Sequence, residues 1–385
     1  MTLTRTITLL ALACSVAPGA ANEFMIIGID SKVELRPSGV TKVKPSGDTV
    51  LVWDISDPAR PKVTSKLDLE NSIFGPPTNL LITPDGTRAL VANSVNWVKV
   101  DGEWNAEPDT RIHVIELTNG RARATSSVNV DAQPSGMGIS ADGTTVVVAN
   151  RKGQSASLLR LGKTVRVTHT ISIEGEAAAV AVTPDGKRAL VTKFAEHAVA
   201  IVEIDGNNLK YSSLNDVAVG RWPYNVQITP NGKLALVANN GNNGFPDGHA
   251  DTVSVIDLEA DPPRAIDHIT VGDGPEGLAI SPDGKLAVVP LLQGSAPPFA
   301  NKWFFHEKGA IAILKIEGKK VSLAGTVETG RFPEGVGFSR DGKHLFVGDL
   351  ADNQISVFKV GGTTLTPEVK IDLPGYPASL RTQVP

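Results

Sequence analysis

Charged and aromatic residues stand beside proline in four short segments of the chain, and these residue types can bind and activate a small molecule. The segments are Arg221-Trp222-Pro223-Tyr224-Asn225, Pro275-Glu276, Arg331-Phe332-Pro333-Glu334 and Tyr376-Pro377. Guanidinium groups bind carboxylates through two parallel hydrogen bonds, so Arg221 and Arg331 favour a small organic acid or lactone as the ligand. Glu276 or Glu334 can act as a general base if burial raises its pKa.

The residues expected to contact this ligand are Arg221, Trp222, Tyr224, Asn225, Arg331 and Tyr376. The alternative is that the arginines and glutamates pair with each other and close a channel as a polar plug. Paired ions also perturb pKa values for structural reasons, so residue types alone do not decide between the two interpretations.

A loop over residues 239–251 carries oxygen and imidazole donors among many Asn and Gly residues. Asp247 and Asp251 are candidate ligands for Ca²⁺, and His249 is a candidate ligand for another divalent ion. The spacing matches no metal motif, and Asn and Gly are also the usual residues of turns. A flexible loop without metal is therefore the alternative, and no other cofactor is predicted.

Residues 297–307 form the most apolar long connection and contain Trp303, Phe304, Phe305 and His306. Contiguous exposed aromatic side chains mark recognition surfaces, so Trp303 and His306 are candidate contacts to a ligand or to a partner protein. The alternative is that the rings pack onto the protein's own rim.

Repeated elements must position these residues. Short alternating apolar runs flank a turn signal that predicts a β-hairpin with Asp-Gly or Asn-Gly at its tip. The turn signals are Pro84-Asp85-Gly86, Ala141-Asp142-Gly143, Pro184-Asp185-Gly186, Pro230-Asn231-Gly232, Pro282-Asp283-Gly284 and Arg340-Asp341-Gly342. A second pattern, in which one charged residue interrupts an apolar strand as in Val253–Leu258, occurs seven times.

At a further repeat position Lys193 stands where other repeats hold Asn or Asp, which makes it another candidate ligand contact.

Seven units of four strands each predict an all-β fold, a seven-bladed β-propeller. The last strand of the chain, around Ser379, has its three missing partners at the start of the chain. These partners are Met25–Ile27, Val50–Ile55 and Lys62–Leu69. Pairing the last strand with them closes the ring and covers strand edges that an open array would expose.

The strand order places the long connections on one face of the ring and the Asp-Gly turns on the other. The long connections are 30–48, 93–110, 239–251 and 291–309. Long loops in a compact domain are usually functional, so the mouth of the central channel on this face is the expected ligand site.

The strings Leu-Val-Ala-Asn at 90–93 and 236–239, and Val-Ser-Val-Ile-Asp at 253–257, resemble the YVTN-type repeat propellers of secreted bacterial proteins. The resemblance covers essentially the whole chain after residue 21. It implies kinship with a group that includes lactonase-like propellers, heavy subunits of quinone-cofactor amine dehydrogenases and surface-layer proteins. The motifs are specific for the fold and carry no information about activity.

Residues 1–21 have the pattern of a secretory signal peptide, with Arg5 before an apolar stretch and small residues up to Ala21. Cleavage after Ala21 would leave residues 22–385 as the propeller, in the periplasm or secreted. A lipoprotein anchored at Cys14, the only cysteine, is the alternative. The net charge of −4 offers no basic surface for nucleic acid, and no later segment is apolar enough to cross a membrane.

Three functions follow from these observations. The first is a monomeric binding module for a small ligand or a periplasmic partner protein. The second is a lactonase-like enzyme that hydrolyses or isomerises a small lactone or sugar-acid derivative. The third is an accessory subunit of a periplasmic dehydrogenase, whose redox centre would belong to another chain.

Overall fold

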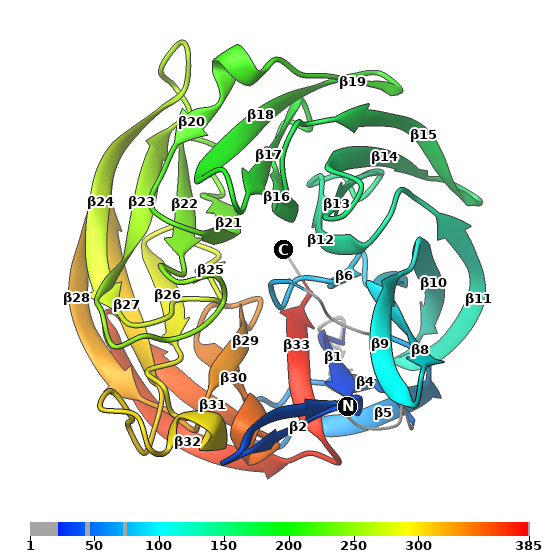
Figure 1. Cartoon of the computed structure of the whole chain (residues 1–385). Coiled ribbons are helices and arrows are strands. Elements are labelled where there is room, and N and C mark those ends of the chain that lie inside the picture. Colours follow the sequence, from blue (N-terminus) through cyan, green and yellow to red (C-terminus); the bar gives the residue numbers. More distant parts are fainter. Residues whose placement is uncertain (1–21, 43–46, 72–74, 384–385) are drawn as a thin grey trace, which may run out of the picture.

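The computed structural model describes residues 22–42, 47–71 and 75–383 of the 385-residue chain. Seven antiparallel sheets stand in a ring around a common axis, which confirms the expected seven-bladed β-propeller (Figure 1). The predicted signal peptide, residues 1–21 with Cys14, lies outside the described residues. No helix in the described part of the chain is long and apolar enough to cross a membrane.

Each blade has four strand positions, which follow the sequence from the axis outward except in blade 1. Blade 1 consists of β33 (Tyr376–Thr382), β1 (Phe24–Asp30), β4 (Thr49–Asp54) and β5 (Lys62–Asp68). Blade 2 consists of β6 (Leu80–Ile82), β7 (Arg88–Ala92), β10 (Arg111–Thr118) and β11 (Arg121–Asn129). Blade 3 consists of β12 (Pro134–Ile139), β13 (Thr145–Asn150), β14 (Ser155–Leu161) and β15 (Val165–Ser172).

The other four blades repeat this order. Blade 4 begins with β16 (Ala177–Val182), β17 (Arg188–Lys193) and β18 (Ala198–Asp205). Its outer strand is divided into β19 (Asn208–Lys210) and β20 (Val217–Ala218), and the 3-10 helix η1 (Ser213–Asn215) lies between them in the sequence. Blade 5 consists of β21 (Pro223–Ile228), β22 (Leu234–Asn239), β23 (Asp251–Asp257) and β24 (Arg264–Gly272). Blade 6 consists of β25 (Ala279–Ile280), β26 (Leu286–Leu291), β27 (Ala310–Glu317) and β28 (Lys320–Glu328). Blade 7 consists of β29 (Pro333–Phe338), β30 (His344–Asp349), β31 (Gln354–Gly361) and β32 (Thr364–Asp372).

The C-terminal strand closes the ring, as the sequence predicts. Strand β33 is the innermost strand of blade 1 and pairs antiparallel with β1, with Ile27 opposite Leu380. Leu380 is fully buried and belongs to the apolar cluster between blades 7 and 1. The two ends of the chain are therefore held together by one sheet and one core.

Six hairpin turns join the first and second strands of the blades with the same hydrogen bonds. In blade 4 the Thr183 hydroxyl donates to Asp185 at 2.6 Å, and the Lys187 amide donates to the same carboxylate oxygen at 3.1 Å. Gly186 has a φ of +68°, which glycine adopts without steric cost. The hydroxyl residues at the equivalent position of the other turns are Thr83, Ser140, Thr229, Ser281 and Ser339.

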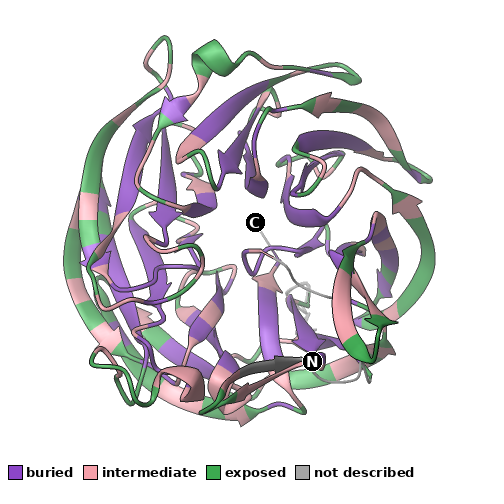
Figure 2. Ribbon diagram, viewed as in Figure 1, coloured by how far each residue is buried: buried purple, intermediate pink, exposed green. Residues whose placement is uncertain are grey.

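The core is divided into sectors. In the described part of the chain, seven apolar clusters each lie between two neighbouring blades. The inner strands are buried, and the outermost strands alternate between exposed and partly buried residues (Figure 2). Each blade therefore obtains its stability from its two neighbours, which requires the ring to be complete.

All four long connections join the second strand of a blade to the third, so they lie on one face as expected. Two of them form hairpins of their own, β2 (Val33–Arg36) with β3 (Gly39–Lys42), and β8 (Val95–Val100) with β9 (Glu103–Pro108). The connection in blade 6 contains the 3-10 helix η2 (Pro297–Phe299), and η3 (Leu350–Asp352) follows β30 in blade 7. We call this side of the ring the long-loop face and the opposite side the turn face.

Candidate functional site

Two glutamates occupy the same repeat position in neighbouring blades at the long-loop face. Glu276 and Glu334 each follow the proline with which the innermost segments of blades 6 and 7 begin. The two segments approach closely, because a Cβ added to Gly277 would lie 2.1 Å from the carbonyl oxygen of Glu334. Only glycine allows this approach at position 277, and it brings the two carboxyl groups into one electrostatic environment.

Burial and mutual repulsion set the charge of this pair. Burial raises the pKa of Glu276 well above its ordinary value of 4.5, the Glu334 charge raises it further, and the Arg151 charge lowers it. Burial also raises the pKa of Glu334 to about 8, with a smaller contribution from Asp30. Neither carboxyl group has an ion-pair partner among the described residues. The pair therefore holds at least one proton at neutral pH.

Arg151 is the cation beside this pair, and we did not identify it from the sequence. Its guanidinium is 4.6 Å from the centroid of the Phe194 ring, and its Nε donates to Glu176. The Phe194 ring in turn contacts Trp222 and Tyr224, at centroid distances of 4.9 and 5.3 Å. Arg151 is 8% exposed, so the stacked ring and the carboxylate hold it in place.

Arg151 occupies a repeat position that also supplies other neighbours of the pair. Arg151, Phe194 and Asn240 each stand one residue after the Asn or Lys that ends the second strand of blades 3, 4 and 5. Asn240 is fully buried, its Nδ2 donates to Glu276 Oε1 at 3.4 Å, and its Oδ1 accepts from the Gly244 amide at 2.7 Å. One repeat position thus supplies three neighbours of the site.

Tyr224 is a neighbour of this pair, and Asn225 follows it on β21. Burial raises the pKa of Tyr224 well above its ordinary value of 10, and the Glu276 charge adds to the effect. Tyr224 is therefore a neutral hydroxyl that can donate a hydrogen bond. Asn225 is 2% exposed, and its Oδ1 has no hydrogen-bond partner.

Other buried oxygens at the same level of the ring also lack hydrogen-bond partners among the described residues. They lie at the beginnings of the inner segments of blades 2 and 3 and belong to Thr78, Asn79 and Ser135. A buried polar atom without a partner costs free energy. The long-loop end of the axis is therefore a polar region with unused hydrogen-bonding capacity.

The predicted pairing of Arg221 and Arg331 with the glutamates was wrong. Arg331 donates from Nε to Asp352 Oδ1 at 2.6 Å and thereby holds the turn after β30. Arg221 is exposed, and the carboxyl group whose pKa it lowers is that of Asp251. Arg151 is instead the arginine whose charge acts on Glu276.

The remaining predicted contacts take part in local structure. The Trp222 amide donates to His197 Nδ1 at 3.1 Å, and the Leu35 amide donates to the Tyr376 hydroxyl at 3.3 Å. Lys193 is buried and its Nζ donates to Asp216 at 2.7 Å. The Leu35–Tyr376 bond joins a long connection to blade 1, whereas the other two bonds involve shorter connections of blade 4.

The aromatic connection divides between the two expected arrangements. Phe304 and Phe305 are partly buried, whereas Trp303 is 77% exposed. Trp303 contacts the 239–251 loop, since a Cβ added to Gly248 would lie 2.5 Å from its ring. His306 is exposed and its Nδ1 is 3.0 Å from the carbonyl oxygen of Phe304.

The two candidate carboxylate ligands accept hydrogen bonds from backbone amides, Asp247 within its own loop and Asp251 from the connection between blades 5 and 6. Asp247 accepts from the His249 amide at 3.0 Å, and Asp251 accepts from the Gly274 amide at 2.9 Å. Burial raises the pKa of Asp251 to about 7. In the described part of the chain, no group of three or more His, Cys, Asp or Glu side chains is arranged to hold a metal ion.

Comparison with known proteins supports the fold and leaves the activity open. No protein-family model and no curated protein sequence matches the chain. A protein proposed to be a 6-phosphogluconolactonase from Bacteroides uniformis ATCC 8492 is similar in structure, with a TM-score of 0.72, 18% identity, and coverage of 94% of this chain and 99% of that chain. Its counterpart from Bacteroides fragilis NCTC 9343 has a TM-score of 0.71 and 17% identity, covering 94% and 98%.

A periplasmic gluconolactonase from Pseudomonas aeruginosa is also similar, with a TM-score of 0.65 and 17% identity over 94% of this chain and 99% of that chain. At these identities the likeness shows a shared propeller fold. The chemistry of this chain must be argued from its own side chains.

Proposed function

We propose that the protein is a hydrolase that opens a small hydroxylated lactone at the long-loop end of the axis. The observation that carries this proposal is the pair of carboxyl groups Glu276 and Glu334, whose pKa values are both raised and which have no ion-pair partner among the described residues. Two neighbouring carboxyl groups with raised pKa values supply a general acid in their protonated form, and a general base once one of them has lost its proton.

These two carboxyl groups can perform both proton transfers of lactone hydrolysis. The ionised carboxyl group of the pair accepts a proton from water as the water oxygen bonds to the lactone carbonyl carbon. The bond between that carbon and the ring oxygen breaks, and the protonated carboxyl group donates its proton to the ring oxygen. The product is a hydroxy acid, and the pair exchanges its protons with solvent before the next turnover.

Two further observations favour a substrate with several hydroxyl groups. The partnerless oxygens of Thr78, Asn79, Ser135 and Asn225 can accept hydrogen bonds from such a molecule. The Tyr224 hydroxyl can donate one. The similar propellers described as gluconolactonases make a sugar lactone the first substrate to test.

The test measures hydrolysis of glucono-1,5-lactone in a pH-stat, with the spontaneous rate subtracted. We expect the wild-type protein to exceed the background and Glu276→Gln and Glu334→Gln to lose about 100-fold in kcat, the lower end of what general acid–base groups contribute. Glu307→Gln, on the exposed connection of blade 6, is the matched control and should retain full activity. A wild type at the background rate, or folded Gln variants with full activity, would contradict the proposal.

A partner protein is the second candidate, and the exposed Trp303 is the observation that favours it. An exposed tryptophan on a long connection is typical of an anchor residue in an interface.

We also propose that residues 1–21 direct export to the periplasm. N-terminal sequencing of the exported protein tests this, because cleavage after Ala21 leaves Asn22 as the first residue.

A further inference from the structure

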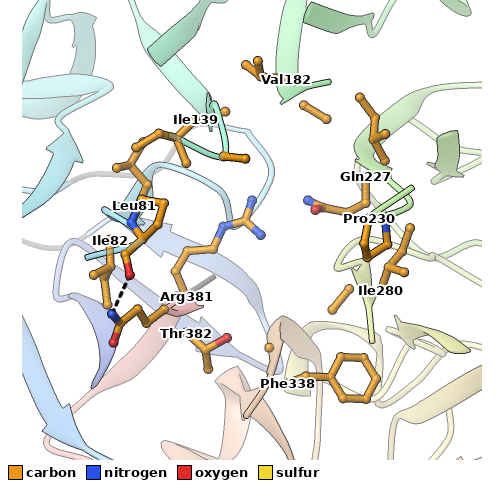
Figure 3. A pocket seen from close by; sticks show the side chains of 18 of the residues that line it. Leu81, Ile82, Ile139, Val182, Gln227, Pro230, Ile280, Phe338, Arg381 and Thr382 are labelled. Carbon is orange, nitrogen blue, oxygen red and sulfur yellow. Dashed lines mark hydrogen bonds between the residues drawn. The ribbon is translucent and has the colours of Figure 1, made fainter. Parts of the chain in front are cut away.

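A second site lies at the opposite end of the axis. A cavity of about 300 Å³ opens at the turn face, between the last residues of the inner strands and the prolines that begin the Asp-Gly turns (Figure 3). The cavity exists because one repeat position of the inner strands is Gly or Ala in four of the seven blades. These residues are Gly138, Ala181, Ala279 and Gly337.

Two polar side chains occupy this repeat position in blades 1 and 5. Arg381 and Gln227 reach into the cavity from opposite sides (Figure 3). Among the described residues that line the cavity, Arg381 is the only charged one. Neither Arg381 nor Gln227 has a side-chain hydrogen bond or ion pair among the described residues.

The rest of the wall is mainly apolar, with Ser140, Ser281, Thr382 and Gln383 as its other polar residues. The side chains at the next position of the inner strands include Ile82, Ile139, Val182, Ile280 and Phe338. Burial lowers the pKa of Arg381 to about 10, so the guanidinium still carries its charge at neutral pH. Arg381 is partly buried and has no partner among the described residues, and a bound anion would offset the cost of withdrawing its charge from water.

We propose that this cavity binds a small organic carboxylate with an apolar body. The Arg381 guanidinium can hold both carboxylate oxygens through two parallel hydrogen bonds, and the Gln227 amide can donate a third. The aliphatic and aromatic walls cover the hydrocarbon part of the ligand. A volume of about 300 Å³ is at the lower end of the range for ligand pockets and fits a molecule the size of benzoate.

This site is independent of the proposed hydrolase. The carboxyl pair lies at the beginnings of the inner segments, and the Arg381 cavity lies at their ends. The apolar wall selects against the hydroxylated molecules proposed for the other end. The two ends of one axis therefore differ in the chemistry they bind.

Isothermal titration and thermal unfolding with benzoate, hexanoate, gluconate and inorganic phosphate test the proposal. We expect benzoate and hexanoate to bind the wild type and raise its Tm, and gluconate and phosphate to bind at least tenfold more weakly. Arg381→Leu should lose benzoate binding at least tenfold, while its Tm without ligand stays equal or rises because the unpaired charge is gone. Arg221→Leu, at the exposed arginine of the other face, is the matched control and should bind benzoate as the wild type does.

Each other outcome overturns the proposal. Unchanged benzoate affinity in Arg381→Leu, or no binding by the wild type, would remove the site. Phosphate binding as tight as benzoate binding would make it a general oxyanion site and exclude a role for the apolar wall. Glu276→Gln should keep its benzoate affinity, so a failure of the hydrolase proposal leaves this result interpretable.

Discussion

Glu276 and Glu334, in adjacent blades, have raised pKa values mainly because of burial, and the Glu334 charge raises that of Glu276 further. The repeat explains why they are neighbours, since both follow the proline at the beginning of an innermost segment. Arg151 and Arg331 show the opposite situation. Arg331 has an Asp partner in its own blade, whereas Arg151 stacks on Phe194 and acts on Glu276 from three blades away.

The raised pKa of Glu334 predicts a pH dependence of stability. Between the unfolded value near 4.5 and the folded value of about 8, the folded protein keeps a proton that the unfolded chain has lost. The free energy of unfolding therefore falls as pH rises through this window. We expect the Tm from calorimetry to decrease from about pH 5 to about pH 8 and the decrease to be smaller in Glu334→Gln.

The slope should diminish without vanishing in this variant, because Glu276, Asp251 and Asp349 also have raised pKa values. Glu307→Gln is the control and should keep the wild-type slope. A Glu334→Gln profile parallel to that of the wild type would show that Glu334 is ionised in the folded protein.

At the scale of elements, the hairpin turn is the most regular unit of the molecule. A Ser or Thr hydroxyl donates to an Asp or Asn two residues later, and the following glycine takes a positive φ. Hydrogen bonds from the Thr183 hydroxyl and the Lys187 amide lower the pKa of Asp185, and the Lys187 charge adds to this effect. Because the bonding is local, the same short string forms the same turn in six blades.

Gly186→Ala tests the turn conformation. The nearest atom to the added Cβ is the Ser140 Cβ at 3.7 Å, so the change causes no clash and only the positive φ is strained. We expect a loss of about 1 kcal/mol in the free energy of unfolding, measured by urea denaturation. Gly325→Ala in β28 is the matched control, since its added Cβ meets nothing within 4 Å and its φ is not left-handed. Equal stability of the two variants would refute the argument.

At the scale of the whole molecule, stability depends on closing the ring. Each apolar cluster is shared by two blades, and β33 supplies the inner strand of the blade that joins the two ends of the chain. An open ring would expose the edge of β1 and one side of that cluster.

Removal of residues 376–385 tests closure. The shortened chain loses the whole of β33 and with it the buried Leu380. We expect its Tm to fall by more than about 10 °C, since removing a buried strand costs several kcal/mol and each kcal/mol shifts the Tm of a large domain by about 2–4 °C. A chain that ends at Gln383 keeps β33 and is the control. An unchanged Tm in the shortened chain would mean that β33 does not hold the ring.

Much of the site could be anticipated from the repeats. The sequence pattern selected Glu276, Glu334, Tyr224 and Asn225 as candidates, because the proline element marks the beginning of the inner segments. It missed Arg151 and Asn240, although both occupy one repeat position, because that position is variable in chemistry from blade to blade. It also assigned the ligand site to the long-loop face alone and did not predict the Arg381 cavity at the turn face.

The sequence by itself determined the number of blades, the chemistry of the turns and the strand that closes the ring, because each of these follows from short patterns whose bonding is local or repeated. Only the tertiary structure decided which side chains meet at the axis. Residues from seven separate strands converge there, and the protonation of Glu276 and the isolation of Arg381 depend on neighbours contributed by other blades. Local pattern carries no information about such contacts, since burial and charge at the axis are properties of the closed ring.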